Sequence, residues 1–347
     1  MKVTVKAYLS NFFIKLAVVG FAVFGHVASH ASELNIYSHR QAFLITPFLD
    51  AFTSETGIKT NVVFASKGLA QRLAAEGASS PADLVLTVDI ARLSVYAEKG
   101  LFAPVQSDIL NRVIPAHLRS KDGTWFGLSK RSRIVGVSKD RVADGAITRI
   151  EDLADPKWRG KICSRPGSHV YNRALVASMI AAHGEVKAEE WARNLVANFA
   201  RRPQGNDRAQ VKAIFEGQCD IAILNHYYYG KLLNSDDAAH RQWADSINVI
   251  FPNQQDNDRG AHVNISGGGI AVHSKNKADA QRLLEFLVSE KAQNLYAKIN
   301  YEYPVDERLE LPEDLKLWGT FKEDQTPVSE IARLSVTAQK IIDRVGW

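Results

Sequence analysis

The sequence lacks the short motifs that mark common catalytic sites. Its 347 residues contain no Gly-x-Ser-x-Gly turn, no Gly-x-x-x-x-Gly-Lys phosphate loop and no His-Glu-x-x-His zinc helix. The run Gly267 to Gly269 does not have the Gly-x-Gly-x-x-Gly spacing of a dinucleotide site. A secreted enzyme with dispersed catalytic residues stays an alternative, but no feature of the sequence asks for one.

Long hydrophobic runs are also missing, with one exception at the N-terminus. Three lysines precede an apolar stretch over residues 16–24, and small residues follow it up to Ala31. This order is typical of a cleaved signal peptide, and the stretch is far shorter than the ~20 residues that span a bilayer. We expect residues 1–31 to be removed, leaving a free periplasmic protein that is not membrane-embedded. No cysteine near the cleavage point can accept a lipid, and an uncleaved anchor is the alternative.

The chain has little net charge. The formal charge of +5 falls to +2 when the leader takes away Lys2, Lys6 and Lys15, because it contains no acidic residue. So weak a field does not favour nucleic acid as a partner. The remaining residues, 32–347, exceed what one hydrophobic core usually fills, so two lobes are expected.

Cysteine is rare as well. The two cysteines, Cys163 and Cys219, both lie in the part of the chain that is expected to reach an oxidising compartment. We therefore predict a disulfide between them. Two buried free thiols are the alternative.

What the sequence does contain is an alternation of β-rich runs and amphipathic stretches, which indicates an α/β protein with helices covering a sheet. Strands are expected at residues 34–37, 60–64, 83–87, 134–137, 221–224 and 262–272. Helices are expected at residues 44–57, 69–77, 90–100, 174–182, 278–287 and 329–343, with one more that holds Trp191, Leu195 and Phe199.

The order of these elements predicts two lobes, each a mixed sheet flanked by helices, with a ligand cleft between them. The N-terminal lobe is expected to comprise residues 32–131 and about 258–305. The C-terminal lobe is expected to comprise residues 132–257 and about 306–347. The chain would then cross between the lobes more than once.

The most unusual local feature is a run of three tyrosines, Tyr227 to Tyr229, directly after the expected strand 221–224. Ligands of α/β sheets bind outside the carboxyl ends of the strands. A cation of high charge density can displace the proton of a phenol, and phenolate oxygen is a hard ligand that suits ferric iron. The alternative is that the tyrosines belong to the core or stack on an organic ligand.

Tyr171 and two basic groups are further candidates. Tyr171 opens the expected helix after a turn, where backbone N–H groups can also hold an anion. Arg40 follows the first strand, and Arg131 lies in a basic group expected to precede the strand 134–137. Arginine suits a planar oxyanion, although ordinary ion pairs explain such residues equally well. His39 and His226 are not assigned as ligands, because a lone histidine is more often simply hydrogen-bonded.

Several segments together resemble the ferric iron-binding proteins of bacterial ABC-type iron importers, a branch of the periplasmic binding proteins. The resemblance spans nearly all of residues 32–347. The matching segments are Ile36-Tyr37-Ser38-His39-Arg40-Gln41, Thr87-Val88-Asp89, Asp155-Pro156-Lys157-Trp158-Arg159-Gly160-Lys161, Gly217-Gln218-Cys219-Asp220, Asn225-His226-Tyr227-Tyr228-Tyr229-Gly230, His262-Val263-Asn264-Ile265-Ser266-Gly267 and Glu302-Tyr303-Pro304-Val305.

The resemblance implies a two-lobed type II binding fold that holds Fe³⁺ between its lobes. Tyr171, Tyr227 and Tyr228 would be the iron-bound phenolates, with Tyr229 packed inward. Arg40 and Arg131 would hold carbonate or a similar anion. The partner would be an inner-membrane ABC permease with its ATPase, and a monomer suits such a carrier.

The sequence departs from many members of this family after Arg40. Where they carry a His or His-Tyr pair, this chain has Gln41-Ala42-Phe43. We therefore expect three tyrosines and an exogenous anion; a site with four or five protein ligands is the alternative. A binding protein for an organic or oxyanion solute, such as a polyamine, sulfate or phosphate, is the alternative function.

Overall fold

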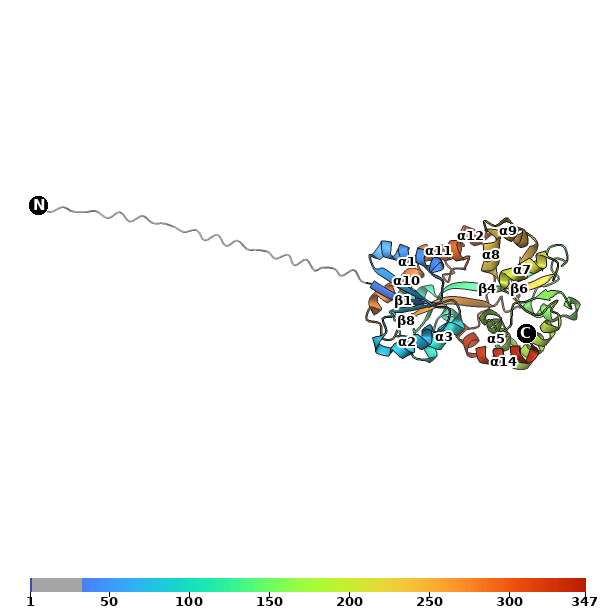
Figure 1. Cartoon of the computed structure of the whole chain (residues 1–347), viewed down its shortest axis with the longest axis horizontal. Coiled ribbons are helices and arrows are strands. Elements are labelled where there is room, and N and C mark those ends of the chain that lie inside the picture. Colours follow the sequence, from blue (N-terminus) through green and yellow to red (C-terminus); the bar gives the residue numbers. More distant parts are fainter. Residues whose placement is uncertain (2–32) are drawn as a thin grey trace. The chain divides into compact units, whose positions relative to one another are not determined.

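The computed structural model describes Met1 and residues 33–347. Apart from Met1, the expected signal peptide lies outside the described residues, so cleavage after Ala31 stays a prediction. Residues 33–347 fold into strands and helices of mixed α/β type (Figure 1).

The strands are β1 (Glu33–Ser38), β2 (Lys59–Phe64), β3 (Leu84–Thr87), β4 (Phe126–Ser138), β5 (Ile162–Cys163), β6 (Ile221–Asn225), β7 (Ile247–Ile250) and β8 (Val263–Ile270). The α-helices are α1 (Ala42–Thr56), α2 (Leu69–Glu76), α3 (Ile90–Glu98), α4 (Asp108–Val113), α5 (Val170–His183), α6 (Glu185–Ala197), α7 (Asp207–Phe215), α8 (His226–Leu233), α9 (Ala238–Asp245), α10 (Lys277–Leu287), α11 (Glu290–Leu295), α12 (Glu313–Lys316), α13 (Val328–Arg333) and α14 (Ser335–Val345). Short 3₁₀ turns lie at Gly77–Ser79, Ala116–Leu118, Ile150–Ala154 and Pro156–Trp158, and a π-helical turn at Tyr296–Asn300.

The strands form a mixed sheet in the order β2-β1-β3-β8-β4-β6-β5, and β7 also pairs with β4. Strand β4 joins the two halves of this sheet. Its first part, up to Ser132, pairs antiparallel with β8, and its second part, from Arg133, pairs antiparallel with β6 and β7. The point where the pairing changes therefore lies inside the basic group of β4.

Helices cover the sheet in two groups. Helices α1, α2, α3, α10 and α11 lie around β1 and β8, whereas α5, α7, α8, α9 and α14 lie on the side of β6 (Figure 1). Helix α13 packs against both α3 and α5. The two-lobed α/β fold expected from the sequence is thereby confirmed, while the residue boundaries of the two lobes stay a prediction.

The glycines of β8 allow the close approach that the sheet needs at its centre. A Cβ on Gly267 would lie 2.7 Å from the carbonyl oxygen of Phe126, and one on Gly268 would lie 2.8 Å from the carbonyl oxygen of Val85. Real Cβ atoms do not come so near, so larger residues here would push β8 away from its neighbours on both sides.

Three expected elements differ from the structure. The strand expected at 134–137 is the longer β4, which contains the basic group instead of following it, because these polar side chains find buried partners that a periodicity argument does not show. The helix expected to hold Phe199 ends at Ala197, and Phe199 instead bridges to Ile162. The helix expected at 329–343 is interrupted at Leu334, because its two parts pack against different neighbours. Helix α13 contacts α3 and α5, whereas α14 contacts α5 and α6.

Candidate functional site

Three tyrosines from two helix starts come together in the structure. Tyr171 lies in the first turn of α5, and Tyr227 and Tyr228 lie in the first turn of α8. The hydroxyl of Tyr227 donates a hydrogen bond to the hydroxyl of Tyr171 at 3.0 Å. The ring centroids of Tyr227 and Tyr228 lie 4.4 Å apart. The structure therefore brings together all three tyrosines expected to bind iron, although Tyr171 lies more than fifty residues before the other two in the sequence.

Local sequence explains why each helix begins where it does. Strand β6 ends at Asn225, whose side chain donates to the hydroxyl of Tyr227 at 3.3 Å and leads directly into α8. His169 precedes α5, and its ring nitrogen Nδ1 accepts a hydrogen bond from the backbone N–H of Tyr171 at 3.3 Å. The His169 cap satisfies a backbone N–H group that α5 itself leaves free. The side chain of Asn225 makes no such cap for α8 and instead holds the hydroxyl of Tyr227.

The phenols of the α8 pair are held in their neutral form. Burial is the main reason that the pKa of Tyr227 is raised well above its usual value, and the nearby phenols of Tyr171 and Tyr228 raise it further. Burial likewise raises the pKa of Tyr228 to about 12. A phenol in this environment gives up its proton only when a cation arrives that stabilises the phenolate.

Arg40 and Arg131 both lie beside this cluster, and both are buried. The Arg40 guanidinium donates from Nη2 to Glu302 at 2.9 Å and to the hydroxyl of Ser266 at 2.5 Å. Arg131 donates to the same hydroxyl at 3.0 Å and to the carbonyl of Ile265 at 2.8 Å. Its Nε is buried and has no hydrogen-bond partner within the described residues. Arg131 therefore has a buried donor that no described residue uses.

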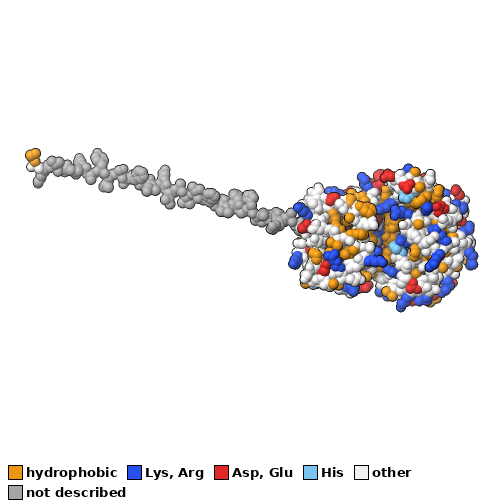
Figure 2. Space-filling model, in the orientation of Figure 1, with side chains coloured by type: hydrophobic (Ala, Val, Ile, Leu, Met, Phe, Trp, Pro, Cys, Tyr) orange, Lys and Arg blue, Asp and Glu red, His pale blue; other side chains and the backbone are white. Residues whose placement is uncertain are grey.

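A cavity of about 410 Å³ contains all five of these residues. Its lining is His39, Arg40, Gln41, Phe43, Leu44, Val88, Arg131, Tyr171, Arg208, Tyr227, Tyr228, Lys231, Asn300 and Glu302. The lining side chains come from both groups of elements that β4 joins: from α1 and from Val88, just after β3, on one side, and from α5, α7 and α8 on the other. The face drawn in Figure 2 shows lysine and arginine side chains near the middle, next to hydrophobic ones.

Carboxylate and imidazole groups do not offer another metal site. No group of three or more His, Cys, Asp or Glu side chains that could hold a metal ion occurs among residues 33–347. The cavity has one carboxylate, Glu302, which is already paired with Arg40 at 2.9 Å. The phenol oxygens are therefore the main anionic ligands that this cavity can offer a hard cation, beside the neutral amides of Gln41 and Asn300.

The two histidines considered in the sequence, His39 and His226, are held by other partners. The Nε2 atom of His39 lies 2.8 Å from the hydroxyl of Tyr96. His226 is fully buried, with Nε2 2.7 Å from the carbonyl oxygen of Tyr301 and Nδ1 3.1 Å from the backbone N–H of Ser132. Burial lowers the pKa of His226 to about 4, so this ring is neutral at ordinary pH. Both rings act as structural links in this arrangement.

Residues 79–322 match the family described as bacterial extracellular solute-binding protein. The chain belongs to this family. Its relatives include iron uptake protein A1 of Synechocystis, which is 44% identical over 316 residues, covering 91% of this chain and 87% of the relative. The family-level resemblance seen in the sequence is confirmed.

Solved structures of related proteins have the same fold as this solute-binding protein. The ferric iron-binding protein A of Mannheimia haemolytica in an open conformation is 47% identical, with a TM-score of 0.85, and the match covers 91% of this chain and 99% of that one. The Trichodesmium protein FutA in complex with iron and citrate ligands is 44% identical, with a TM-score of 0.87, and the match covers 91% and 100% of the two chains.

Sequence reasoning missed several residues of this solute-binding protein's cleft. Glu302 belongs to a segment that carried the resemblance, but its role as the buried partner of Arg40 was not foreseen. Arg208 and Lys231 line the cavity from α7 and α8. Helical spacing was the available signal for Lys231, which lies one turn after Tyr227. Tyr229 lies beside Trp318, with ring centroids 6.1 Å apart, and does not line the cavity.

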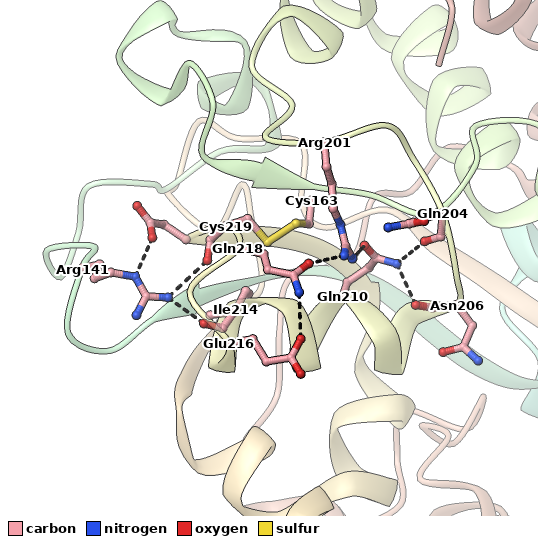
Figure 3. Close-up of a disulfide and its surroundings, with 11 residues drawn as sticks. Arg141, Cys163, Arg201, Gln204, Asn206, Gln210, Ile214, Glu216, Gln218 and Cys219 are labelled. Atoms are coloured by element: carbon pink, nitrogen blue, oxygen red, sulfur yellow. Dashed lines mark hydrogen bonds and ion pairs between the residues drawn. A yellow bond between two sulfur atoms is a disulfide. The ribbon is translucent and has the colours of Figure 1, made fainter.

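The disulfide predicted from the cysteine count is confirmed. Cys163 at the end of β5 is bonded to Cys219 just before β6, with their Cα atoms 5.9 Å apart (Figure 3). Both residues are buried. Next to the disulfide, Arg201 donates to the side chain of Gln218 at 2.5 Å, and Arg141 donates to the carbonyl of Cys219 at 3.2 Å. The bond therefore ties the starts of the two segments that lead to Tyr171 and to Tyr227.

Within the described residues, no helix combines the length and the apolar composition that crossing a membrane requires.

Proposed function

We propose that this chain is a periplasmic carrier that captures ferric iron between its lobes through the phenolates of Tyr171, Tyr227 and Tyr228. The observation that carries the proposal is the convergence of these phenols, two of them 3.0 Å apart, in a cavity with a basic rim. Iron uptake by the Synechocystis relative and the iron-bound Trichodesmium structure support it.

Charge balance favours Fe³⁺ over softer or less charged ions. Three phenolates neutralise the three positive charges of ferric iron without a carboxylate ligand. Hard oxygen ligands suit a hard cation, whereas the thiolate and imidazole groups that favour zinc or copper are not gathered at this site within the described residues. The only carboxylate of the cavity stays with Arg40.

An exogenous anion would complete the iron coordination. Arg131 supports this role best, because its buried Nε lacks a partner within the described residues and its guanidinium carbon lies 5.6 Å from the ring centroid of Tyr171. Arg40 would contribute the donors that Glu302 and Ser266 do not use. Carbonate or a similar small oxyanion fits this pair, and citrate accompanies iron in the Trichodesmium relative.

The loaded protein would deliver its iron to an inner-membrane ABC permease driven by an ATPase, as expected for the solute-binding family. It would act as a monomer without catalysing a reaction. Secretion would depend on the leader of residues 1–31.

The proposal is tested by the visible spectrum of residues 32–347 titrated with ferric citrate and bicarbonate. Wild type is expected to develop a phenolate-to-iron charge-transfer band. The Tyr228→Phe variant keeps the ring but loses the oxygen, so its band should be weakened or shifted and its iron affinity should fall by at least tenfold. The Tyr229→Phe variant is the matched control, because Tyr229 does not line the cavity.

A colourless wild type from which no iron co-purifies would overturn the iron assignment. The binding of an organic or oxyanion solute would then become the leading interpretation. An iron band that is identical in wild type and in Tyr227→Phe and Tyr228→Phe would place the iron elsewhere.

A further inference from the structure

A buried carboxylate lies behind the tyrosine cluster. Asp207 is the first residue of α7 and is fully buried. Its Oδ1 accepts a hydrogen bond from Arg165 at 2.8 Å. Its Oδ2 accepts one from Arg133 at 2.8 Å and one from the backbone N–H of Asn225, also at 2.8 Å. One side chain therefore joins β4, the end of β6 and the loop that precedes α5.

Two of the three partners lead to Tyr171. Arg165 comes six residues before Tyr171, and its guanidinium carbon lies 5.2 Å from the centroid of that ring. Arg133 also donates from Nη2 to the side chain of Asn172 at 2.5 Å, and Asn172 directly follows Tyr171 in α5. The side chain of Asn172 in turn donates to the carbonyl of Arg165 at 3.1 Å. The start of α5 is therefore held from two sides.

The third partner leads to the other tyrosines. Asn225 ends β6 and directly precedes α8, so its backbone N–H fixes the origin of the turn that carries Tyr227 and Tyr228. Its side chain accepts from Arg133 at 3.2 Å and donates to the hydroxyl of Tyr227 at 3.3 Å. The starts of α5 and α8 are therefore both held by the carboxylate of Asp207.

The charge of Asp207 has no substitute nearby. Among the described residues it is the only carboxylate that forms an ion pair with Arg133 or with Arg165, and all three side chains are buried. A buried guanidinium without a partner is costly, so the three groups stay together. Asp207 does not line the cavity, and therefore would not touch the iron itself.

We propose that Asp207 is a positioning residue of the tyrosine site, which sets the distance and direction between Tyr171 on α5 and Tyr227 and Tyr228 on α8. The inference rests on the proposed function, because positioning matters only if the three phenols bind one ligand together. Outer residues that orient metal ligands typically contribute 10- to 100-fold in metal affinity.

A purely electrostatic role makes a different prediction. Three phenols that exchange their protons for one Fe³⁺ leave the net charge of the site unchanged, and the accompanying anion adds negative charge. By charge alone, the loss of the nearby negative charge of Asp207 should therefore leave iron affinity unchanged or raise it. Weaker iron binding after its removal would point to position.

The test is Asp207→Asn in residues 32–347, with ferric citrate and bicarbonate as the probe. The amide keeps the size of the side chain, but its NH₂ group cannot accept a hydrogen bond. If the NH₂ group replaces Oδ1, Arg165 loses its acceptor; if it replaces Oδ2, both Arg133 and the backbone N–H of Asn225 lose theirs. We expect iron affinity to fall about 10- to 100-fold and the charge-transfer band to shift in energy. Circular dichroism and the urea midpoint report whether the variant is folded.

The matched control is Asp324→Asn. Asp324 is also a buried carboxylate paired with an arginine, Arg259 at 2.5 Å, but it does not line the cavity and forms no bond to the tyrosine-bearing helices. Its variant should keep the wild-type band and affinity.

If Asp207→Asn does not fold, Arg165→Met is the deciding variant, because Arg133 and Asn225 then still hold Asp207. Arg165→Met is expected to shift the band and to weaken iron binding. Arg165→Lys should partly restore both.

The possible failures are distinguishable. A wild type without a charge-transfer band overturns the proposed function and this inference with it. A wild-type band that stays unchanged in position and affinity in folded Asp207→Asn overturns only the inference. If Asp207→Asn is unfolded, an unchanged band and iron affinity in Arg165→Met likewise overturns only the inference.

Discussion

At the residue scale, the candidate site depends on side chains that are neutral until a cation arrives. Burial keeps the phenols of Tyr227 and Tyr228 protonated, and the buried guanidinium of Arg131 lies close to the same cluster. Fully buried phenolates without a bound cation would be costly, so these two phenols stay protonated. Under the proposed function, iron binding would then be coupled to proton release.

This coupling gives the pH dependence a definite sign. Because the pKa values of Tyr227 and Tyr228 are raised, both phenols carry protons at pH 7, and falling pH makes protons compete better with iron. Iron affinity should fall about tenfold for each unit by which the pH is lowered, for each phenol proton that iron displaces. Proton release is measured in weakly buffered solution at pH 7 and saturating iron. Tyr228→Phe should release one proton fewer per iron than wild type; equal release would contradict phenolate ligation by Tyr228.

At the element scale, the short strand β5 is the weakest link between the tyrosine-bearing segments. It pairs with β6 through only two residue pairs, Ile162 with Ile221 and Cys163 with Ala222. The disulfide from Cys163 to Cys219 reinforces the same place (Figure 3). Asp207 binds Arg165 and Asn225, which lie nearer in the chain to Tyr171 and Tyr227 than the two cysteines do. We therefore expect the disulfide to stabilise the fold and Asp207 to set the geometry of the site.

Replacing both cysteines by serine separates these roles. A disulfide that closes a loop of this length, with a sequence separation of 56, stabilises by about 4 kcal/mol in the chain-entropy model. The double variant should therefore unfold at a clearly lower urea concentration. Below its midpoint, its iron affinity should stay within about threefold of wild type. A loss of the charge-transfer band in the folded variant would show instead that the disulfide positions the tyrosines.

At the scale of the whole molecule, the three tyrosines and the two arginines are not distributed evenly. Tyr171, Tyr227 and Tyr228 lie on α5 and α8, on the side of β6, whereas Arg40 follows β1 on the other side. Strands β4 and β8 connect the two sides. Under the proposed function, a ligand held by the tyrosines would reach the other lobe through its anion, and this contact would favour closure of the cleft.

Small-angle scattering on residues 32–347 tests this closure. We expect a monomer with and without iron, and a smaller radius of gyration once iron and bicarbonate are bound. Tyr228→Phe at the same iron concentration is the control, because weak binding should leave its radius unchanged. A wild type that binds one iron per chain without contraction would mean that the loaded cleft stays open.

The sequence alone determined the features that depend on neighbouring residues. Helical and strand periodicity predicted most elements of the α/β fold, and the strand before Tyr227 predicted that this tyrosine lies at the carboxyl end of a strand. The pairing of Cys163 with Cys219 followed because no other cysteine is present. These features are local, or have only one possible partner, so no knowledge of the chain path was needed.

Only the tertiary structure decided which buried charges meet. Arg40 pairs with Glu302 across 262 positions, and Asp207 joins Arg133 and Arg165, which come from β4 and from the loop before α5. In the sequence nothing marks Glu302, Asp207 or Arg165 as buried or as partners of these arginines. Burying a charge requires a partner, but its identity is set by the path of the chain through both lobes. For that reason the tyrosines proposed as ligands could be singled out in the sequence, whereas the residues proposed to hold them in place could not.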